Sequence, residues 1–282
     1  MNRIVLTGCT ATPLASYLKA LGVLRLLASR HPQVRGHWRG DLFVLSAALD
    51  EQAVVEFFLH HYEPTPIIAP WNGGSGFYAK DNKAALQSLN ASSSRRFAPY
   101  RHALSAAEDA LLHFSRDASP KGDDKSRLLA ALRGTIPDST LDWFDAAVVL
   151  AGDTPQYPPL LGTGGNDGRL DFTNNFMQRL SEVLPLGDEP PSGAARDWLF
   201  TALFGAAAPN LVKRAIGQFL PNQAGGPNAG MGFECDGAIN PWDFILMIEG
   251  ALVFAAAAVR RNADDPSGVL SYPFTVRPVL AG

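Results

Sequence analysis

An apolar run over residues 244–259, interrupted by Glu249, is the feature that most constrains what this chain can fold into. The run falls short of the roughly 20 apolar residues that a membrane-spanning helix requires. We therefore predict a buried helix over about residues 241–261, and no membrane partner. Such a helix needs a hydrophobic core around it.

The composition can supply that core. Of the 282 residues, 46% are hydrophobic and 18% are charged, which is typical of a globular chain. The length fits one large domain or two smaller ones, and we predict a single domain over residues 1–282 with loop insertions. The segment before Gly8 is too short for a signal peptide, which predicts a cytoplasmic location. Cys9 and Cys235 form no CxxC pair, so neither a disulfide framework nor a zinc site is indicated.

Helical periodicity dominates the chain and predicts an α+β fold that is mostly helical, with a few short strands and Gly/Asn-rich loops. After Thr12 and Pro13, leucines recur at helical spacing and predict a helix to about residue 29. Residues 4–6 predict a short strand, and the turn at Gly40 and Asp41 predicts a hairpin. Asp50 is the expected cap of a helix to about residue 62. Further helices are predicted over about residues 82–89, 99–114, 123–133, 141–150, 172–184 and 193–207.

Charge is distributed unevenly along the chain. The net charge of −3 argues against a protein that binds nucleic acid through phosphate contacts alone, because such proteins are normally basic. Residues 1–40 nevertheless contain six Lys or Arg and no Asp or Glu, which leaves −9 for the remainder. This asymmetry predicts one basic face, with Arg35 and Arg39 as candidate nucleic-acid contacts. The alternative is that these cations are ordinary solvated surface.

Three loops, over residues 69–78, 161–169 and 223–232, combine paired glycines with asparagine, and each precedes a predicted helix. Glycine lets a ligand approach the backbone closely, and free N–H groups at a helix start attract anions such as phosphate. Asn side chains both donate and accept hydrogen bonds. We therefore predict nucleic-acid contacts from Asn72, Gly73, Gly74, Ser75, Lys80 and Lys83 in and after the first loop, from Asn166, Arg169, Asn174, Asn175, Gln178 and Arg179 in and after the second, and from Asn228 in the third.

The same loops have a simpler interpretation, because Gly-Asn segments commonly cap helices and form tight turns. The aromatic residues Trp71, Phe77 and Tyr78 are candidate stacking platforms for bases. Individually, Trp71, Phe77 and Trp242 are more typical of core residues, given the area that such side chains bury.

Enzyme signatures are not found in the sequence. Residues 162–168 have the spacing GxGxxxG, one residue off the dinucleotide-binding fingerprint, and neither a P-loop nor a GxSxG nucleophile turn is present. The six histidines show no metal-ligand spacing. We therefore predict a non-catalytic protein with no cofactor and no bound metal.

Five segments, read together, resemble the large subunit of type I-G (formerly I-U) CRISPR effector complexes, also called surveillance or Cascade complexes. They are LASYLKALGVLR at 14–25, APWNGGSGF at 69–77, LGTGGNDGRLDF at 161–172, NPWDF at 240–244 and SYPF at 271–274. The resemblance covers nearly the whole chain. Members of that family usually continue well beyond this point, so residues 1–282 are expected to be the N-terminal portion.

The resemblance implies a role in antiviral defence within an RNA-guided complex, where base pairing reads the target sequence. Large subunits of this kind recognise the short motif beside the target (the PAM), help to open the duplex and contact the 5′ end of the guide. The expected partners are CRISPR RNA, target double-stranded DNA, the backbone and guide-end-binding subunits, and a separate helicase-nuclease. Two alternatives remain: a structural subunit that docks onto proteins without touching DNA, and an enzyme that binds a phosphorylated ligand in the Gly/Asn loops.

Overall fold

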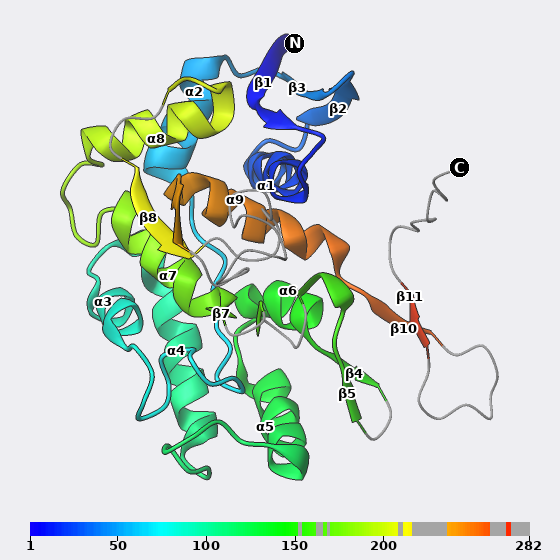
Figure 1. The fold of residues 1–282 in the computed structure, drawn as a ribbon, viewed down its shortest axis with the longest axis vertical. Coiled ribbons are helices and arrows are strands. Elements are labelled where there is room, and N and C mark those ends of the chain that lie inside the picture. The colour runs from blue at the N-terminus through cyan, green and yellow to red at the C-terminus, as the bar shows by residue number, and fades with distance from the viewer. Residues whose placement is uncertain are drawn as a thin grey trace.

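A computed structural model describes residues 1–151, 154–161, 166–167, 170–207, 211–215, 236–259 and 269–271. Helices make up most of these residues and strands are few, which confirms the predicted mostly helical α+β fold. The α-helices are α1 (Leu14–Arg30), α2 (Glu51–Glu56), α3 (Ala84–Ala91), α4 (Ala98–Leu111), α5 (Gly122–Thr135), α6 (Asp138–Ala147), α7 (Phe172–Val183), α8 (Gly193–Phe204) and α9 (Pro241–Ala251) (Figure 1).

An antiparallel sheet at the N-terminal end is built from β1 (Asn2–Thr10), β2 (Arg35–Arg39) and β3 (Leu42–Ala47), in the order β1-β3-β2. The predicted hairpin is confirmed: β2 and β3 pair across a turn in which Gly40 has φ +59°. The predicted strand at 4–6 is only the middle of β1. One face of the sheet packs on α1, where Tyr17 stacks on Trp38 with ring centroids 5.4 Å apart.

The remaining strands form short antiparallel pairs that connect helices. These pairs are β4 (Val149–Ala151) with β5 (Thr154–Gln156), β6 (Asn166–Asp167) with β7 (Leu170–Asp171), β8 (Val212–Ala215) with β9 (Asp236–Ile239), and β10 (Ala257–Val259) with β11 (Val269–Ser271). In Figure 1 the β10–β11 pair lies to one side of the helices.

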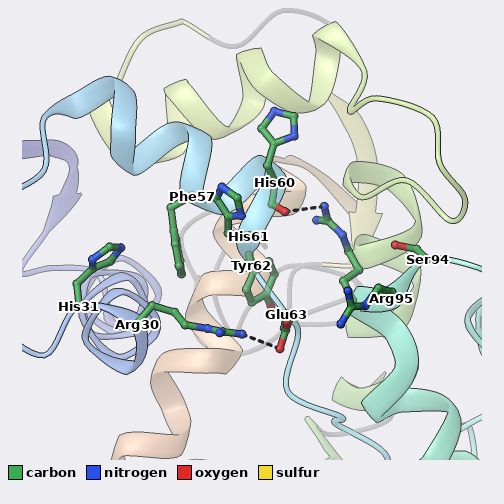
Figure 2. A pocket seen from close by; sticks show the side chains of 10 residues that line it. Arg30, His31, Phe57, His60, His61, Tyr62, Glu63, Ser94 and Arg95 are labelled. Carbon is green, nitrogen blue, oxygen red and sulfur yellow. Dashed lines mark hydrogen bonds and ion pairs between the residues drawn. The ribbon is translucent and has the colours of Figure 1, made fainter.

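Helix α2 begins as predicted, with the Asp50 carboxylate accepting a hydrogen bond from the Ala53 N–H at 2.8 Å. The chain then widens into a π-helical turn, η1 (Phe57–His61), and becomes extended at Tyr62. A 3₁₀ turn, η2 (Arg95–Phe97), leads into α4. Side chains of η1 and residues next to it line a cleft, shown in Figure 2.

Two predicted helices extend past the end of the observed helix into residues that form a strand. The helix predicted over 141–150 ends at Ala147, and residues 149–151 form β4. The helix predicted over 241–261 ends at Ala251, passes through the 3₁₀ turn η5 (Leu252–Phe254) and gives way to β10. In both places apolar residues continue past the helix end, so periodicity alone could not locate it.

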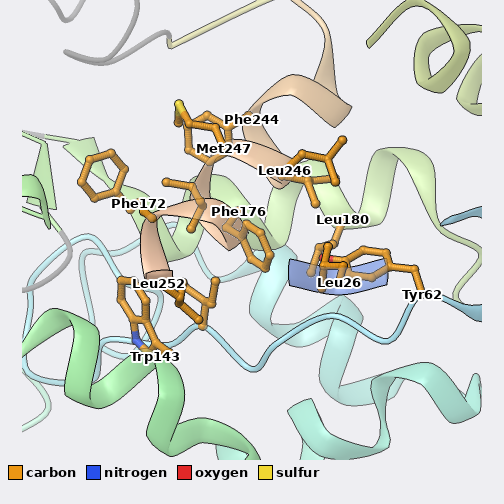
Figure 3. Packing of buried hydrophobic residues seen from close by; sticks show 14 of the residues in the cluster. Leu26, Tyr62, Trp143, Phe172, Phe176, Leu180, Phe244, Leu246, Met247 and Leu252 are labelled. Atoms are coloured by element: carbon orange, nitrogen blue, oxygen red, sulfur yellow. The ribbon is translucent and has the colours of Figure 1, made fainter. Parts of the chain in front are cut away.

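The buried side chains form one contiguous cluster that extends from Ile4 to Leu252. Helix α9 lies at its centre and packs against α1 and α7 (Figure 3). The expected core role of the large aromatic residues is confirmed, because Trp71, Phe77 and Trp242 are each at most 2% exposed. Trp242 also donates its indole N–H to the Ala195 carbonyl at 2.9 Å, which satisfies the one polar atom of that side chain.

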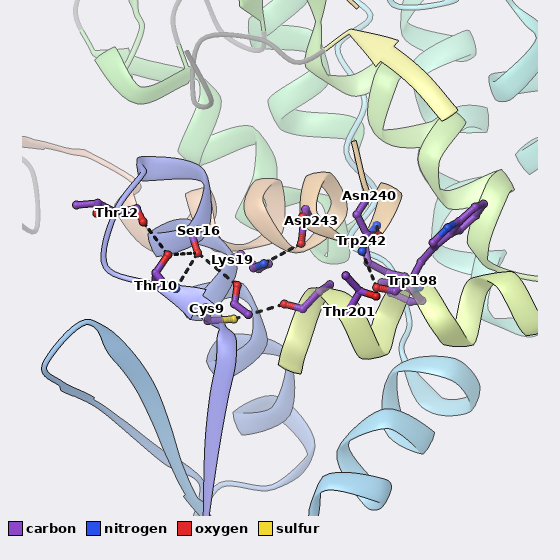
Figure 4. A network of polar contacts seen from close by, with 12 residues as sticks. Cys9, Thr10, Thr12, Ser16, Lys19, Trp198, Thr201, Asn240, Trp242 and Asp243 are labelled. Carbon is purple, nitrogen blue, oxygen red and sulfur yellow. Dashed lines mark hydrogen bonds and ion pairs between the residues drawn. The ribbon is translucent and has the colours of Figure 1, made fainter. Parts of the chain in front are cut away.

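Helices α1 and α9 cross with their backbones in close contact at two glycines. A Cβ atom on Gly22 would overlap the carbonyl oxygen of Leu246, and one on Gly250 would overlap that of Leu18. Lys19, on the same side of α1, donates to Asp243 at 2.8 Å (Figure 4). Two segments quoted above for the resemblance, at 14–25 and 240–244, therefore meet in the core.

A buried carboxylate lies at the other end of this crossing. Glu249 is 0% exposed and accepts four hydrogen bonds: from Arg25 Nη1 at 2.6 Å, from the Tyr62 hydroxyl at 2.7 Å, and from Thr65 Oγ1 and N at 2.7 and 3.0 Å. Burial and the negative charge of Glu249 raise the pKa of Tyr62 well above its ordinary value. Glu249, the polar residue that interrupts the apolar run, thus accepts hydrogen bonds from α1 and from the segment after η1, and links both to α9.

Candidate nucleic-acid interface

The outer face of the three-stranded sheet carries a group of basic side chains, the basic sheet face, made of Arg3, Arg35, His37 and Arg39. Arg35, His37 and Arg39 alternate along β2 and are exposed, so they share one face. Arg3 and Arg35 are both paired with Ser46 across the sheet, which places Arg3 on the same face. The Nη1 of Arg35 donates to the carbonyls of Pro32 and Val34, at 2.7 and 2.8 Å. None of the four has an acidic partner within the described residues.

The other basic residues of the first 40 are not part of this face, because each is paired with a carboxylate. Lys19 is buried against Asp243, Arg25 bonds to Glu249 and Asp142, and Arg30 lies 2.9 Å from Glu63. The predicted basic face therefore contains half of the six cations that suggested it. The other three cations form ion pairs with acidic residues that are distant in sequence. A count of charges along the chain cannot detect such pairs.

In the first Gly/Asn loop, the backbone N–H groups already bind an anion from the same chain. Gly74 and Gly76 have φ values of +83° and +97°, and their N–H groups donate to the Asp81 carboxylate at 2.8 and 2.9 Å. The N–H of Tyr78 donates to the same carboxylate at 3.2 Å. Glycine does let these N–H groups point toward an anion, as expected. The anion that they bind is the carboxylate of Asp81, whereas we predicted a phosphate.

Several candidate residues of this loop are core residues rather than surface contacts. Asn72 and Ser75 are 3% and 0% exposed, and the Ser75 hydroxyl donates to the Asn72 carbonyl at 2.6 Å. Lys125 donates to the side-chain oxygen of Asn72 at 3.3 Å. The loop folds inward because Trp71, Phe77 and Tyr78 bury their rings beside it. The exposed candidates are Gly73, Gly74 and Lys80, with Lys83 partly buried.

Of the second set of candidates, Asn174 contacts the first loop, and the others that the structure describes lie on α7 or in β6. Asn174 is 6% exposed and donates to the carbonyls of Gly74 and Asn82, at 2.7 and 3.0 Å. Arg179 is 3% exposed and forms an ion pair with Glu182 at 3.0 Å. Asn175 and Gln178 remain partly exposed on α7. The backbone of Asn166 pairs with that of Asp171. Arg169 and Asn228 lie outside the described residues.

A buried carboxylate begins α7 where these two segments meet. Asp171 Oδ1 accepts from the N–H groups of Thr173 and Asn174, both at 2.9 Å, and from the Thr173 hydroxyl. Its Oδ2 is buried and has no hydrogen-bond partner among the described residues. Burial raises the pKa of Asp171 from 3.8 to about 7; the bonds from Thr173 and Asn174 oppose this rise, and the charge of Asp81 adds to it.

This carboxylate predicts a pH-dependent stability. Because the folded-state pKa lies above the unfolded one, the folded protein binds the extra proton, and stability decreases as pH rises from about 4 to about 7. Asp171→Asn keeps an N-cap oxygen and carries no charge. The free energy of unfolding of the variant, relative to that of the natural chain, should increase by roughly 2–3 kcal/mol from pH 5 to pH 8, since one pKa unit corresponds to about 1.4 kcal/mol. Urea unfolding of both proteins at pH 5 and at pH 8 measures this increase. If the two proteins differed in stability by the same amount at both pH values, the raised pKa of Asp171 would be contradicted.

A basic cleft lies next to η1 and η2, and its side chains were not among the predicted site residues. Two sequence signals pointed there: the adjacent basic pairs His60-His61 and Arg95-Arg96. They are 34 residues apart and fall at a helix end and in a polar segment, so only the tertiary structure brings them to one cleft.

No protein-family model matches the chain, and no curated protein matches it. Among the helices of the described ranges, none combines the length and apolar character that a bilayer span requires. The same ranges contain no cluster of three or more His, Cys, Asp or Glu side chains suited to a metal ion. Cys9 is a buried free thiol whose pKa is raised by burial to about 12, and Cys235 lies outside these ranges.

Proposed function

We propose that this chain is a non-catalytic, nucleic-acid-binding part of an RNA-guided CRISPR effector of type I-G, corresponding to the N-terminal portion of its large subunit. The observation that carries the nucleic-acid role is the basic sheet face. The assignment to this class of complex rests on the five sequence segments that resemble the family.

The basic sheet face suits a phosphate backbone for three reasons. Its cations come from two strands and are exposed, so a polyanion can approach several at once. Alternate residues on a strand stand about 7 Å apart, which gives Arg35, His37 and Arg39 a regular row. The bonds from Arg35 to two backbone carbonyls hold its guanidinium in place before any ligand binds. Contacts of this kind position a nucleic acid and do not read its sequence.

In the proposed complex, base pairing with CRISPR RNA supplies sequence specificity, and this chain binds target double-stranded DNA beside the paired region. Recognition of the adjacent motif, duplex opening, contact with the 5′ end of the guide and recruitment of a helicase-nuclease belong to the same proposal. The backbone and guide-end-binding subunits would be the protein neighbours.

The test is a double charge reversal, Arg35→Glu with Arg39→Glu. We expect affinity for duplex DNA to fall by about tenfold or more, equally for unrelated sequences, because phosphate contacts carry no sequence information. The slope of log affinity against log salt should become shallower by about two, one for each arginine that no longer binds a phosphate. Fluorescence anisotropy at several salt concentrations measures both quantities.

A matched control is Arg127→Glu with Arg133→Glu, which changes the net charge equally on α5, distant in sequence from the sheet. Both arginines sit in exposed ion pairs, so the control should fold. If the control weakens binding as much as the sheet variant, only overall charge matters. Unchanged affinity in the sheet variant would favour the protein-docking alternative.

A further inference from the structure

The basic cleft is a cavity of about 560 Å³ between the end of α1, the π-helical turn η1 and the start of η2 (Figure 2). Its basic lining consists of Arg30, His31, His60, His61, Arg95 and Arg96. A volume of this size is within the range of pockets that hold small organic ligands. The turn on its wall is π-helical, a local geometry that is rare and frequently found at functional sites.

The arginines of the cleft are not neutralised equally. Arg30 forms an ion pair with Glu63 at 2.9 Å, and His60 lies 3.1 Å from Glu56. Neither Arg95 nor Arg96 has an acidic partner among the described residues, and Arg95 is exposed. The cleft therefore retains positive charge that the protein itself does not pair.

Arg96 provides a positioned donor. Its Nη2 donates to the carbonyl of Leu59 at 3.0 Å and to that of His60 at 3.5 Å, which are carbonyls left free where the helical turn ends. Its Nη1 is buried and has no hydrogen-bond partner in the part of the chain that the structure describes. A buried guanidinium N–H without an acceptor is unfavourable, and burial lowers the pKa of Arg96. Arg96 thus lines the cleft with a guanidinium that is held in place and has one unused donor.

We propose that the basic cleft binds the phosphate of a nucleotide, either free or within a nucleic-acid strand. The guanidinium groups of Arg95 and Arg96 supply charge-assisted hydrogen bonds to phosphate oxygens, the geometry for which arginine is suited. The His31, His60 and His61 rings provide further ring nitrogens around the same volume. This site is separate from the basic sheet face and does not depend on the function proposed for it.

The test uses AMP, adenosine and a short single-stranded oligonucleotide as probes, with calorimetric titration of the whole chain. We expect AMP to bind and adenosine to bind at least tenfold more weakly, since the phosphate makes the main contacts. Arg95→Glu should weaken AMP binding by about tenfold or more, and Arg95→Ala by less. The Arg95 side chain is exposed and has no partner within the described ranges, so both variants should melt as the natural chain does.

The controls separate this site from the sheet. The variant with Arg35→Glu and Arg39→Glu, and Arg127→Glu alone, should keep full AMP affinity. An oligonucleotide that binds more tightly than AMP and loses affinity in Arg95→Glu would identify a strand as the ligand, whereas tighter AMP binding would identify a free nucleotide. No AMP binding at millimolar concentration, equal binding of adenosine, or undiminished binding by Arg95→Glu would each overturn the proposal.

Discussion

Replacing Gly250 by alanine is expected to destabilise the protein by about 3–5 kcal/mol, or to prevent folding altogether. The added Cβ would overlap the carbonyl oxygen of Leu18 and lie 2.8 Å from the backbone nitrogen of Gly22, so the obstacle is backbone that cannot rotate away. Helices α1 and α9 would have to separate along a buried interface. Overpacking a core typically costs 1–3 kcal/mol, and a clash with backbone exceeds that range because no side-chain rearrangement relieves it.

Gly134→Ala is the matched control for that substitution. Gly134 is also a helical glycine, on α5, but a Cβ there would have no neighbour within 4 Å. Alanine is favoured over glycine inside helices, so this variant should be neutral or more stable by up to about 1 kcal/mol. Urea unfolding followed by circular dichroism compares the two. Similar stabilities for both variants would show that the two helices do not cross as closely as described.

Replacing Glu249 by alanine is expected to cost about 3–5 kcal/mol. The substitution removes the acceptor of four hydrogen bonds and leaves the Tyr62 hydroxyl and the Thr65 N–H buried without partners. It also removes the buried carboxylate from Arg25, which then keeps only the exposed Asp142 as an ion-pair partner among the described residues.

Asp142→Ala tests the same arginine from its exposed side. Asp142 lies 3.1 Å from Arg25 and its side chain is 74% exposed, so we expect a cost below about 1 kcal/mol. Thermal unfolding of the two variants at one pH separates the contributions. A small effect of Glu249→Ala would mean that water replaces the carboxylate, and that this centre does not hold the three segments together.

Much of the secondary structure follows from the sequence alone, because it depends on neighbours in the chain. Leucines at helical spacing predicted α1, and Asp50 predicted the start of α2 through a cap made three residues later. The turn at Gly40 predicted the β2–β3 hairpin. Helix ends were less predictable where apolar residues continued past them, as at Ala147 and Ala251, since their termination depends on what packs against the following segment.

The site depended on contacts between residues far apart in the chain, and these only the tertiary structure decided. The sequence indicated that the glycines at 74 and 76 leave backbone N–H groups available as donors. It did not indicate that the Asp81 carboxylate would accept hydrogen bonds from them. It showed cations at 19, 25 and 30, but not the carboxylates of α9 and the other segments that pair with them. It could not show that His60-His61 and Arg95-Arg96 line one cleft. Local patterns record which chemical groups are present, whereas their availability to a ligand depends on which partners the fold brings to them.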